Sequence, residues 1–164
     1  MIIDVIVYTS KCGHTRRYAE LLGERIGKPV YSLDEAAKAL SKDSRVLYMG
    51  WIHASHIQGF KKAMQQFDLK CVCGVGLCDT GTLKDEVRKA TEIPNTLPLF
   101  TIQGGMDRSS LKGLDKMLIS MLAKGLASKK DKSAEDIRMS ELLNSDTDFV
   151  CEENLAEVLK FLAR

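Results

Sequence analysis

The residues best suited to chemistry lie near the N-terminus, in a short polar stretch that follows an apolar run. The stretch consists of Ser10, Lys11, Cys12, Gly13, His14 and Thr15. Ser10 and Thr15 offer hydroxyl donors, and Gly13 lets a ligand approach the backbone closely. A loop at the start of a helix also presents free backbone N–H groups, which the helix dipole makes more attractive to anions. We interpret the stretch as a phosphate-binding loop, the alternative being an ordinary strand-to-helix turn capped by Thr15.

The spacing of this loop excludes better-known anion-binding motifs. A P-loop requires a second glycine followed by Lys and Ser or Thr, whereas Lys11 precedes the only glycine here. A dinucleotide-binding fingerprint requires three glycines. A cysteine phosphatase loop would carry Arg six positions after Cys12, where Tyr18 stands.

Two further groups of candidate residues follow apolar runs. They are Trp51, Ile52 and His53, after the run 45–50, and Cys78, Asp79, Thr80 and Gly81, after the run 70–77. Both runs are typical of buried strands, and open α/β sheets bind ligands beyond the carboxyl ends of their strands. Trp51 offers a flat ring for stacking, the alternative being packing against the next helix. The alternative for the second group is a capped turn.

The chain contains five cysteines, at positions 12, 71, 73, 78 and 151. An odd number at irregular spacing predicts free thiols rather than a disulfide framework. The Cys-x-Cys-x4-Cys spacing of the middle three matches no standard zinc or iron–sulfur pattern, so we predict no metal site. A thiol enzyme that uses Cys12 remains an alternative, because a helix N-terminus lowers the pKa of a thiol.

Length and composition favour one domain, spanning residues 1–164. The chain is 45% hydrophobic, enough for a core of its own, and its net charge of +2 gives no indication of nucleic-acid binding. We find no secretory signal and no apolar run long enough to cross a bilayer, and we therefore expect a cytoplasmic location.

Apolar runs and amphipathic patterns alternate along the chain. Strands are predicted at residues 2–8, 30–33, 45–50, 70–77 and 97–102, and helices at 16–26, 35–40, 58–67 and 83–92. The alternation predicts an α/β fold with a five-stranded parallel sheet covered on both faces. Right-handed crossovers and a ligand loop after the first strand favour the strand order 2-1-3-4-5.

The C-terminal part begins with the most periodic segment of the chain, residues 109–126. Its apolar stripe consists of Leu111, Leu114, Leu118, Met121 and Leu122, with Met117 beside it. The simplest interpretation is a helix that covers the core. Nearby lysines also allow a weak peripheral contact with a membrane surface, or contact with a partner. Residues 127–148 form a polar excursion, and a closing helix is predicted at 152–162.

The phosphate-binding loop resembles the FMN phosphate loop of flavodoxins, commonly Ser/Thr-x-Thr-Gly-Asn-Thr. In this chain Cys12 replaces the usual Thr, and His14 replaces the usual Asn. The whole chain is similar to a single flavodoxin domain, a three-layer sandwich. The short domain and the Met-bearing helix after the fifth strand also resemble the FMN-dependent protoporphyrinogen IX dehydrogenase branch, which passes electrons to menaquinone.

This resemblance implies an FMN cofactor, with the phosphate at Ser10–Thr15 and the ring between Trp51–His53 and Cys78–Gly81. The protein would then be a redox enzyme or an electron carrier with a small-molecule or protein redox partner. Near-neutral charge favours an enzyme, since soluble electron-carrying flavodoxins are strongly acidic. An alternative is a flavin-free binding or regulatory module of the same fold. The sequence indicates neither the substrate nor the oligomeric state.

Overall fold

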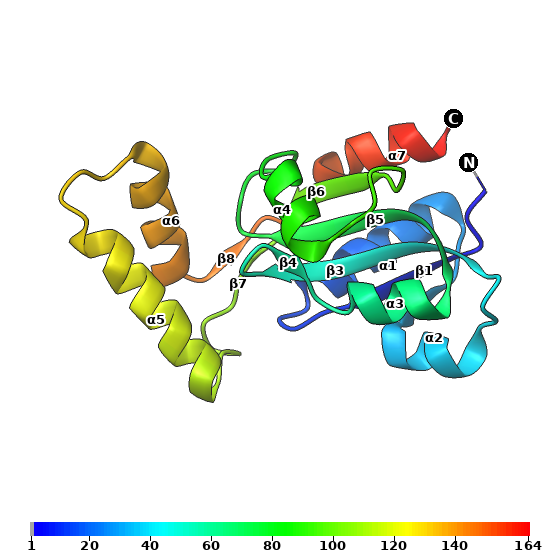
Figure 1. Cartoon of the computed structure of the whole chain (residues 1–164), viewed down its shortest axis with the longest axis horizontal. Coiled ribbons are helices and arrows are strands. Elements are labelled where there is room, and N and C mark those ends of the chain that lie inside the picture. The colour runs from blue at the N-terminus through cyan, green and yellow to red at the C-terminus, as the bar shows by residue number, and fades with distance from the viewer. Residues whose placement is uncertain (1) are drawn as a thin grey trace.

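The computed structural model describes residues 2–164 and has a central, mostly parallel sheet (Figure 1). Its parallel strands are β1 (Val5–Thr9), β2 (Val30–Ser32), β3 (Arg45–His53), β5 (Asp68–Gly76) and β6 (Leu99–Gln103). They lie in the order β2-β1-β3-β5-β6. The predicted α/β class is therefore confirmed.

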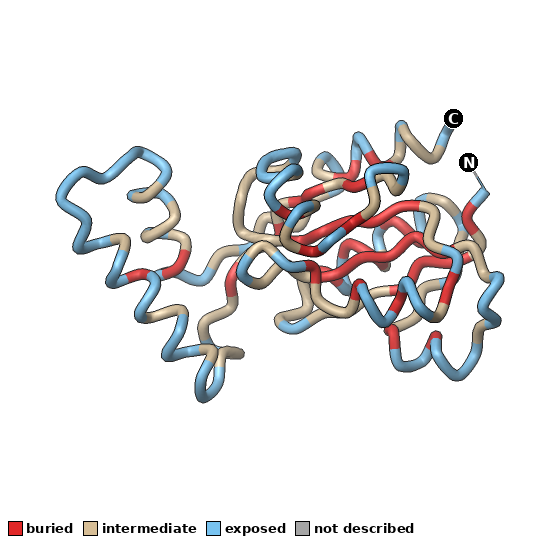
Figure 2. Tube along the Cα trace, viewed as in Figure 1, coloured by how far each residue is buried: buried red, intermediate tan, exposed pale blue. Residues whose placement is uncertain are grey.

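Helices pack on both faces of the sheet and enclose two hydrophobic clusters (Figure 2). On one face lie α1 (His14–Ile26) and the C-terminal pair η1 (Glu152–Leu155) and α7 (Ala156–Leu162). On the other face lie α2 (Leu33–Ala39), α3 (Phe60–Gln66) and α4 (Lys84–Thr91). The result is a three-layer arrangement of helix, sheet and helix.

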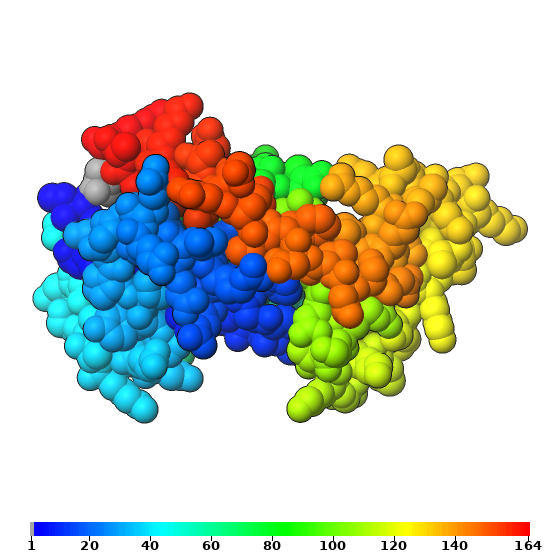
Figure 3. All heavy atoms as spheres, turned by 180° about the vertical axis from the view of Figure 1, so that it is seen from behind, coloured from blue at the N-terminus to red at the C-terminus, as the bar shows by residue number. Residues whose placement is uncertain are grey.

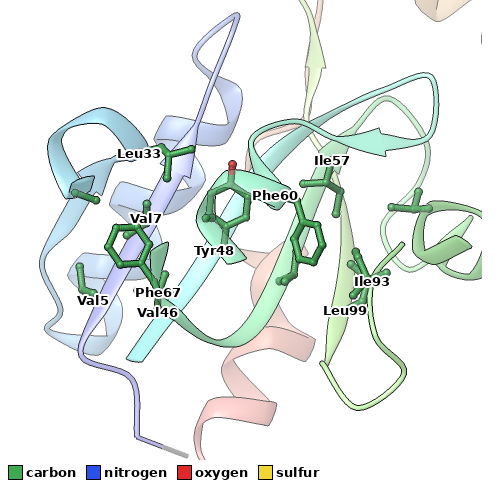
Figure 4. Packing of buried hydrophobic residues seen from close by; sticks show 14 residues of the cluster. Val5, Val7, Leu33, Val46, Tyr48, Ile57, Phe60, Phe67, Ile93 and Leu99 are labelled. Atoms are coloured by element: carbon green, nitrogen blue, oxygen red, sulfur yellow. The ribbon is translucent and has the colours of Figure 1, made fainter. Parts of the chain in front are cut away.

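The alternation of side chains along each strand divides the core between these two layers. Val5 and Val7 of β1 pack on the side of α2 and α3, whereas Ile6 packs on the side of α1. Figure 4 shows Val7, Tyr48 and Phe60 in the first of these layers. Burial on both faces explains why the strands appear in the sequence as continuous apolar runs.

The sheet contains one strand more than predicted, and β3 is longer than predicted. Instead of ending at Gly50, β3 continues to His53 and turns back into the short antiparallel strand β4 (His56–Ile57). Ala54 and Ser55 form the turn with φ of 47° and 62°. Two consecutive left-handed residues match the twist of a tight hairpin, but the usual glycine or asparagine signal is missing from the sequence.

After β6 the chain leaves the sheet as a two-stranded ribbon that carries a helical hairpin. The ribbon pairs β7 (Gly105–Met106) with β8 (Thr147–Asp148). The helical hairpin consists of α5 (Gly113–Ser128) and α6 (Ala134–Asn144), and it projects beyond the carboxyl-terminal edge of the sheet (Figure 1). The polar excursion thus contains a helix of its own.

The prediction that the helix in residues 109–126 covers the core is wrong. Leu114 is 73% exposed, Leu118 49% and Met121 62%. The side of α5 that faces α6 carries Ala123, which is buried, and Ile119. A two-helix hairpin has only one internal interface, so the wider apolar pattern of α5 leaves a stripe of side chains outside it.

Candidate functional site

The predicted phosphate-binding loop lies between the end of β1 and the start of α1. Gly13 precedes the helix with a φ of 91°, and its N–H donates to Ser10 Oγ at 3.1 Å. No side chain caps the helix, and Thr15 is buried at 2% exposure, so the alternative of a turn capped by Thr15 is wrong. A Cβ at Gly13 would meet nothing within 4 Å. Because no side chain caps α1, its first backbone N–H groups are left to solvent or a ligand.

A cavity of about 580 Å³ adjoins this loop on the side of β2. Its lining residues are Tyr8, Thr9, Ser10, Lys11, Gly13, Arg16, Ser32, Leu33, Asp34 and Lys62. Three of them are basic and one is acidic. Arg16 Nε lies 2.7 Å from Glu20, and Lys62 Nζ lies 2.8 Å from Asp34, so each of these cations already has a partner. The volume is that of a small-molecule site, and what favours an anion there is the uncapped start of α1.

Trp51 and His53 lie next to the loop, on the same face of β3. Their ring centroids are 5.6 Å apart, and Lys11 Nζ lies 5.1 Å from the centroid of the indole ring. Lys11 also forms an ion pair with Asp115 of α5. Lys11 therefore connects the phosphate-binding loop, the candidate stacking residue and the helical hairpin.

Ile52 lies on the opposite face of β3 and belongs to the core. It packs against the cluster under α3 and α4, and a Cβ at Gly74 would lie 2.9 Å from its Cδ1. The structure thus brings together Trp51 and His53 but separates Ile52 from them. The reason is the alternation of side chains along a strand that is longer than predicted.

The loop Cys78–Gly81 follows β5 at the same edge of the sheet, but the side chains of Asp79 and Thr80 already have partners. Asp79 accepts two hydrogen bonds from Arg138 of α6, at 2.7 and 2.5 Å. Thr80 Oγ1 donates to Asn154 Oδ1 at 2.7 Å and accepts from the N–H of Gln103 at 3.0 Å. Cys78, Gly81 and the backbone of this loop are left to contact a ligand.

The thiols of Cys78 and Cys12 have different surroundings. Burial raises the pKa of the Cys78 thiol, and the nearby carboxylates of Asp79 and Glu86 raise it further. Cys12, in the phosphate-binding loop, accepts a hydrogen bond from Ser110 Oγ at 2.9 Å. The two thiols lie on different loops, and neither forms a disulfide.

His14 contacts the ribbon rather than the cavity. Its side chain is 12% exposed, and its Nε2 lies 4.0 Å from Asp148 of β8. Arg17 donates to the same carboxylate at 2.6 Å, and this hydrogen bond is the main reason why the pKa of Asp148 is lowered. His14 and Arg17 together hold the base of the helical hairpin against α1.

Tyr8, Ser32 and Lys62 line the cavity and were not predicted as site residues. Tyr8 was assigned only to the first strand, and Lys62 to the face of a helix. A usable signal existed, because the strand order 2-1-3-4-5 places the end of the second strand beside the end of the first. Residues that follow the second strand, such as Ser32, therefore border the phosphate-binding loop.

Comparisons with protein-family models, with curated proteins and with solved structures find no match to this chain. Within residues 2–164, no helix is both long and apolar enough to cross a membrane. The same residues contain no group of three or more His, Cys, Asp or Glu side chains that could hold a metal ion. The case for a function therefore rests on the site itself.

Proposed function

We propose that this protein is an FMN-binding flavoprotein with a flavodoxin-like fold and a redox function. The observation that carries the proposal is the uncapped N-terminus of α1, where Gly13 leaves backbone N–H groups open beside Lys11 and Arg16. Such a helix end attracts a phosphate group. The order of the parallel strands, which places the first strand between the second and third, also agrees with this fold.

In this proposal the loop Ser10–Thr15 holds the phosphate, and Trp51 packs against the isoalloxazine ring. Bound FMN supplies the electron-accepting chemistry. The chain positions the ring, excludes water from one side of it through Trp51, and supplies positive charge through Lys11. The cavity itself does not include Trp51 or the loop Cys78–Gly81. Lys11 must therefore move away from the indole ring before a flavin ring can pack there.

The proposed redox role is that of an enzyme rather than an electron carrier. A net charge of +2 gives the surface no excess of acidic residues with which to attract a basic protein partner. The reaction partner would be a small molecule or a redox protein. The further placement in the protoporphyrinogen IX dehydrogenase branch rests on the sequence resemblance alone.

A flavin-free module that binds another phosphate-bearing molecule is the second candidate. It is favoured by the position of the cavity, which extends toward Ser32 and Lys62 and away from Trp51. A thiol enzyme is the third, and the hydrogen bond from Ser110 to Cys12 Sγ is the contact in its favour. Loss of an activity in Cys12→Ser with FMN binding intact would support the thiol enzyme.

The first experiment is an absorption spectrum of the purified protein, followed by FMN titration monitored by flavin fluorescence. We expect quenching by the wild-type protein and at least a hundredfold weaker binding by Gly13→Asp, because a carboxylate would repel the phosphate.

Gly27→Asp is the matched control. Gly27 lies at the other end of α1, has a φ of 63°, and a Cβ there also meets nothing within 4 Å. Both substitutions place an aspartate at a left-handed position, so their backbone strain is similar. Because Gly27 lies at the end of α1 away from the phosphate-binding loop, Gly27→Asp should bind FMN like the wild type. A colourless protein that ignores FMN, or equal loss in both variants, would contradict the proposal.

A further inference from the structure

Helix α5 carries an exposed apolar stripe that nothing in the described part of the chain covers. The stripe consists of Leu114, Met117, Leu118, Met121 and Leu122, which are between 49% and 73% exposed. These five make up half of the exposed large hydrophobic side chains in residues 2–164. Such a concentration on one helix marks an interaction surface, whereas single exposed apolar side chains do not.

The stripe faces away from the rest of the helical hairpin. The opposite side of α5 packs through Ile119 and Ala123 against Met139 and Leu143 of α6. The helical hairpin stands out beyond the sheet in both views of the molecule (Figures 1 and 3). Its ion pairs with the body, Lys11–Asp115 and Arg138–Asp79, hold the helices in place without covering the stripe.

Lysines lie at the two ends of α5 and on its polar side. Residues 112–132 contain six lysines and two aspartates. Lys112, Lys116 and Lys124 are exposed, and none of the ion pairs formed within residues 2–164 includes them. Asp115 is the only acidic residue of α5, and it is bound by Lys11. An apolar stripe on a helix whose polar side and ends carry unneutralised lysines complements a surface that is both apolar and anionic.

We propose that α5 docks this protein onto an anionic lipid surface, with the stripe among the acyl chains and the lysines at the headgroups. An amphipathic helix of this kind lies in the plane of the interface and does not span the bilayer. Its lysines gain electrostatic attraction from the anionic lipids. Leu and Met side chains suit such a surface because they are flexible enough to fill a fluid environment.

A second copy of the chain is a poorer occupant for the same stripe. Two α5 helices packed through their stripes would bring lysine-rich surroundings together whether they ran parallel or antiparallel. Asp115, the one acid available within α5, is already held by Lys11. Like charges at close range oppose such a dimer.

Two of the three acidic residues of α6, Asp136 and Glu141, contribute little negative charge near the stripe. Asp136 is bound by Lys129 at 2.7 Å and by the N–H of Ser133. Glu141 lies two residues from both Met139 and Leu143, which face α5. Helical periodicity therefore turns Glu141 toward the side of the hairpin that lies away from the stripe.

The test is flotation of the full chain with vesicles of phosphatidylcholine, alone or mixed with phosphatidylglycerol. We expect binding to the anionic vesicles that weakens with salt. The double variant Leu118→Glu, Met121→Glu should lose it, with Met64→Glu as the matched control, since Met64 is 46% exposed on α3. The triple variant Lys112→Gln, Lys116→Gln, Lys124→Gln should bind on the order of a hundredfold more weakly.

The charge control is Lys42→Gln, an exposed lysine in the turn before β3, which should bind like the wild type. All the substituted side chains are exposed, and circular dichroism would verify the fold of each variant. Failure to bind any vesicle would overturn the proposal, and so would equal binding to neutral and anionic vesicles. Loss of a dimer in Leu118→Glu, Met121→Glu without vesicle binding would identify a second copy as the occupant instead. None of these results depends on FMN binding.

Discussion

Gly59 shows how tightly single residues are fixed at the edge of the sheet. It precedes α3 with a φ of 79°, and a Cβ there would lie 2.2 Å from the Tyr48 hydroxyl and 2.7 Å from Thr9 Cγ2. The same hydroxyl donates to the backbone oxygen of Gln58 at 2.6 Å, and burial raises its pKa. The end of β1, from which the phosphate-binding loop starts, therefore depends on the absence of a side chain at position 59.

We predict that Gly59→Ala lowers the free energy of unfolding by about 3 kcal/mol, since it adds overpacking to left-handed strain. Urea denaturation would measure the change. Gly27→Ala is the control, because Gly27 has a similar φ of 63° but open space around a Cβ. Gly27→Ala should lower the free energy of unfolding by about 1 kcal/mol, which corresponds to the backbone strain alone. Equal losses in the two variants would refute the overpacking.

Asp4 makes the stability of the fold depend on acid pH. Hydrogen bonds from the Arg45 side chain and backbone lower the pKa of Asp4 to about 2, below the ordinary value of an aspartate. A lowered pKa contributes stability above the unfolded value, and the contribution is lost as the pH falls from about 4 to about 2. We predict that, across this pH window, the melting temperature of Asp4→Asn depends less on pH than that of the wild type. An equal pH dependence of the melting temperature in the variant and the wild type would contradict the prediction.

At the scale of elements, the helical hairpin is the least secured part of the fold. Its buried cluster contains only Met106, Ala123 and Leu143, whereas each face of the sheet buries a much larger set. Elements with few buried apolar contacts open with lower free energies than the body of a domain. Hydrogen exchange should therefore be faster in α5 and α6 than in β3 and β5.

Leu143→Ala should open the helical hairpin without unfolding the sheet. Leu143 is 2% exposed, and removing a buried leucine side chain costs about 2–5 kcal/mol. That loss exceeds the free energy with which so small a cluster can hold the two helices together. Amide protection should therefore disappear in α5 and α6 alone. In the control Leu155→Ala, in the main core at 0% exposure, protection should fall throughout the sheet. A uniform loss of protection in Leu143→Ala would show that the hairpin is not a separate unit.

Buried elements were predictable from sequence because burial on both faces leaves a local apolar signal. Cys71 and Cys73 fell within such a run, and both are fully buried on one face of the sheet. The helical hairpin was not predictable, since apolar periodicity locates a stripe but does not reveal what the stripe faces. The strand β4 was missed because its turn uses Ala54 and Ser55 instead of glycine.

The candidate site was predictable to the extent that it depends on chain order. The loop Ser10–Thr15 follows β1, and its Lys11 lies over Trp51 near the end of β3, whereas the cavity includes neither Trp51 nor Cys78–Gly81. Sequence did not reveal that Asp79 is bound by Arg138, because the two lie 59 positions apart. Nor did it reveal that Ile52 belongs to the core, since this depends on where β3 ends.

At the scale of the whole molecule, the helical hairpin and the phosphate-binding loop are coupled through one ion pair. Lys11 binds Asp115 of α5, and Lys11 also lines the cavity beside the phosphate-binding loop. Under the proposed function, a ligand phosphate would compete with Asp115 for the same ammonium group.

We predict that Asp115→Asn strengthens FMN binding a few-fold and that Lys11→Gln weakens it by about tenfold. The effects are modest because the ion pair is partly exposed to solvent. Fluorescence titration at low and moderate salt would measure both. Weaker binding in Asp115→Asn would show that the ion pair supports the site instead of competing with it.

The central claim is that the open N-terminus of α1 binds the phosphate of FMN, and one comparison tests it most directly. FMN and riboflavin share the same ring and differ in the phosphate, so their dissociation constants should be measured side by side with the wild type and Gly13→Asp. We predict that the wild type binds FMN at least a hundredfold more tightly than riboflavin, and that Gly13→Asp removes this preference. Equal affinity of the wild type for both flavins would contradict the claim.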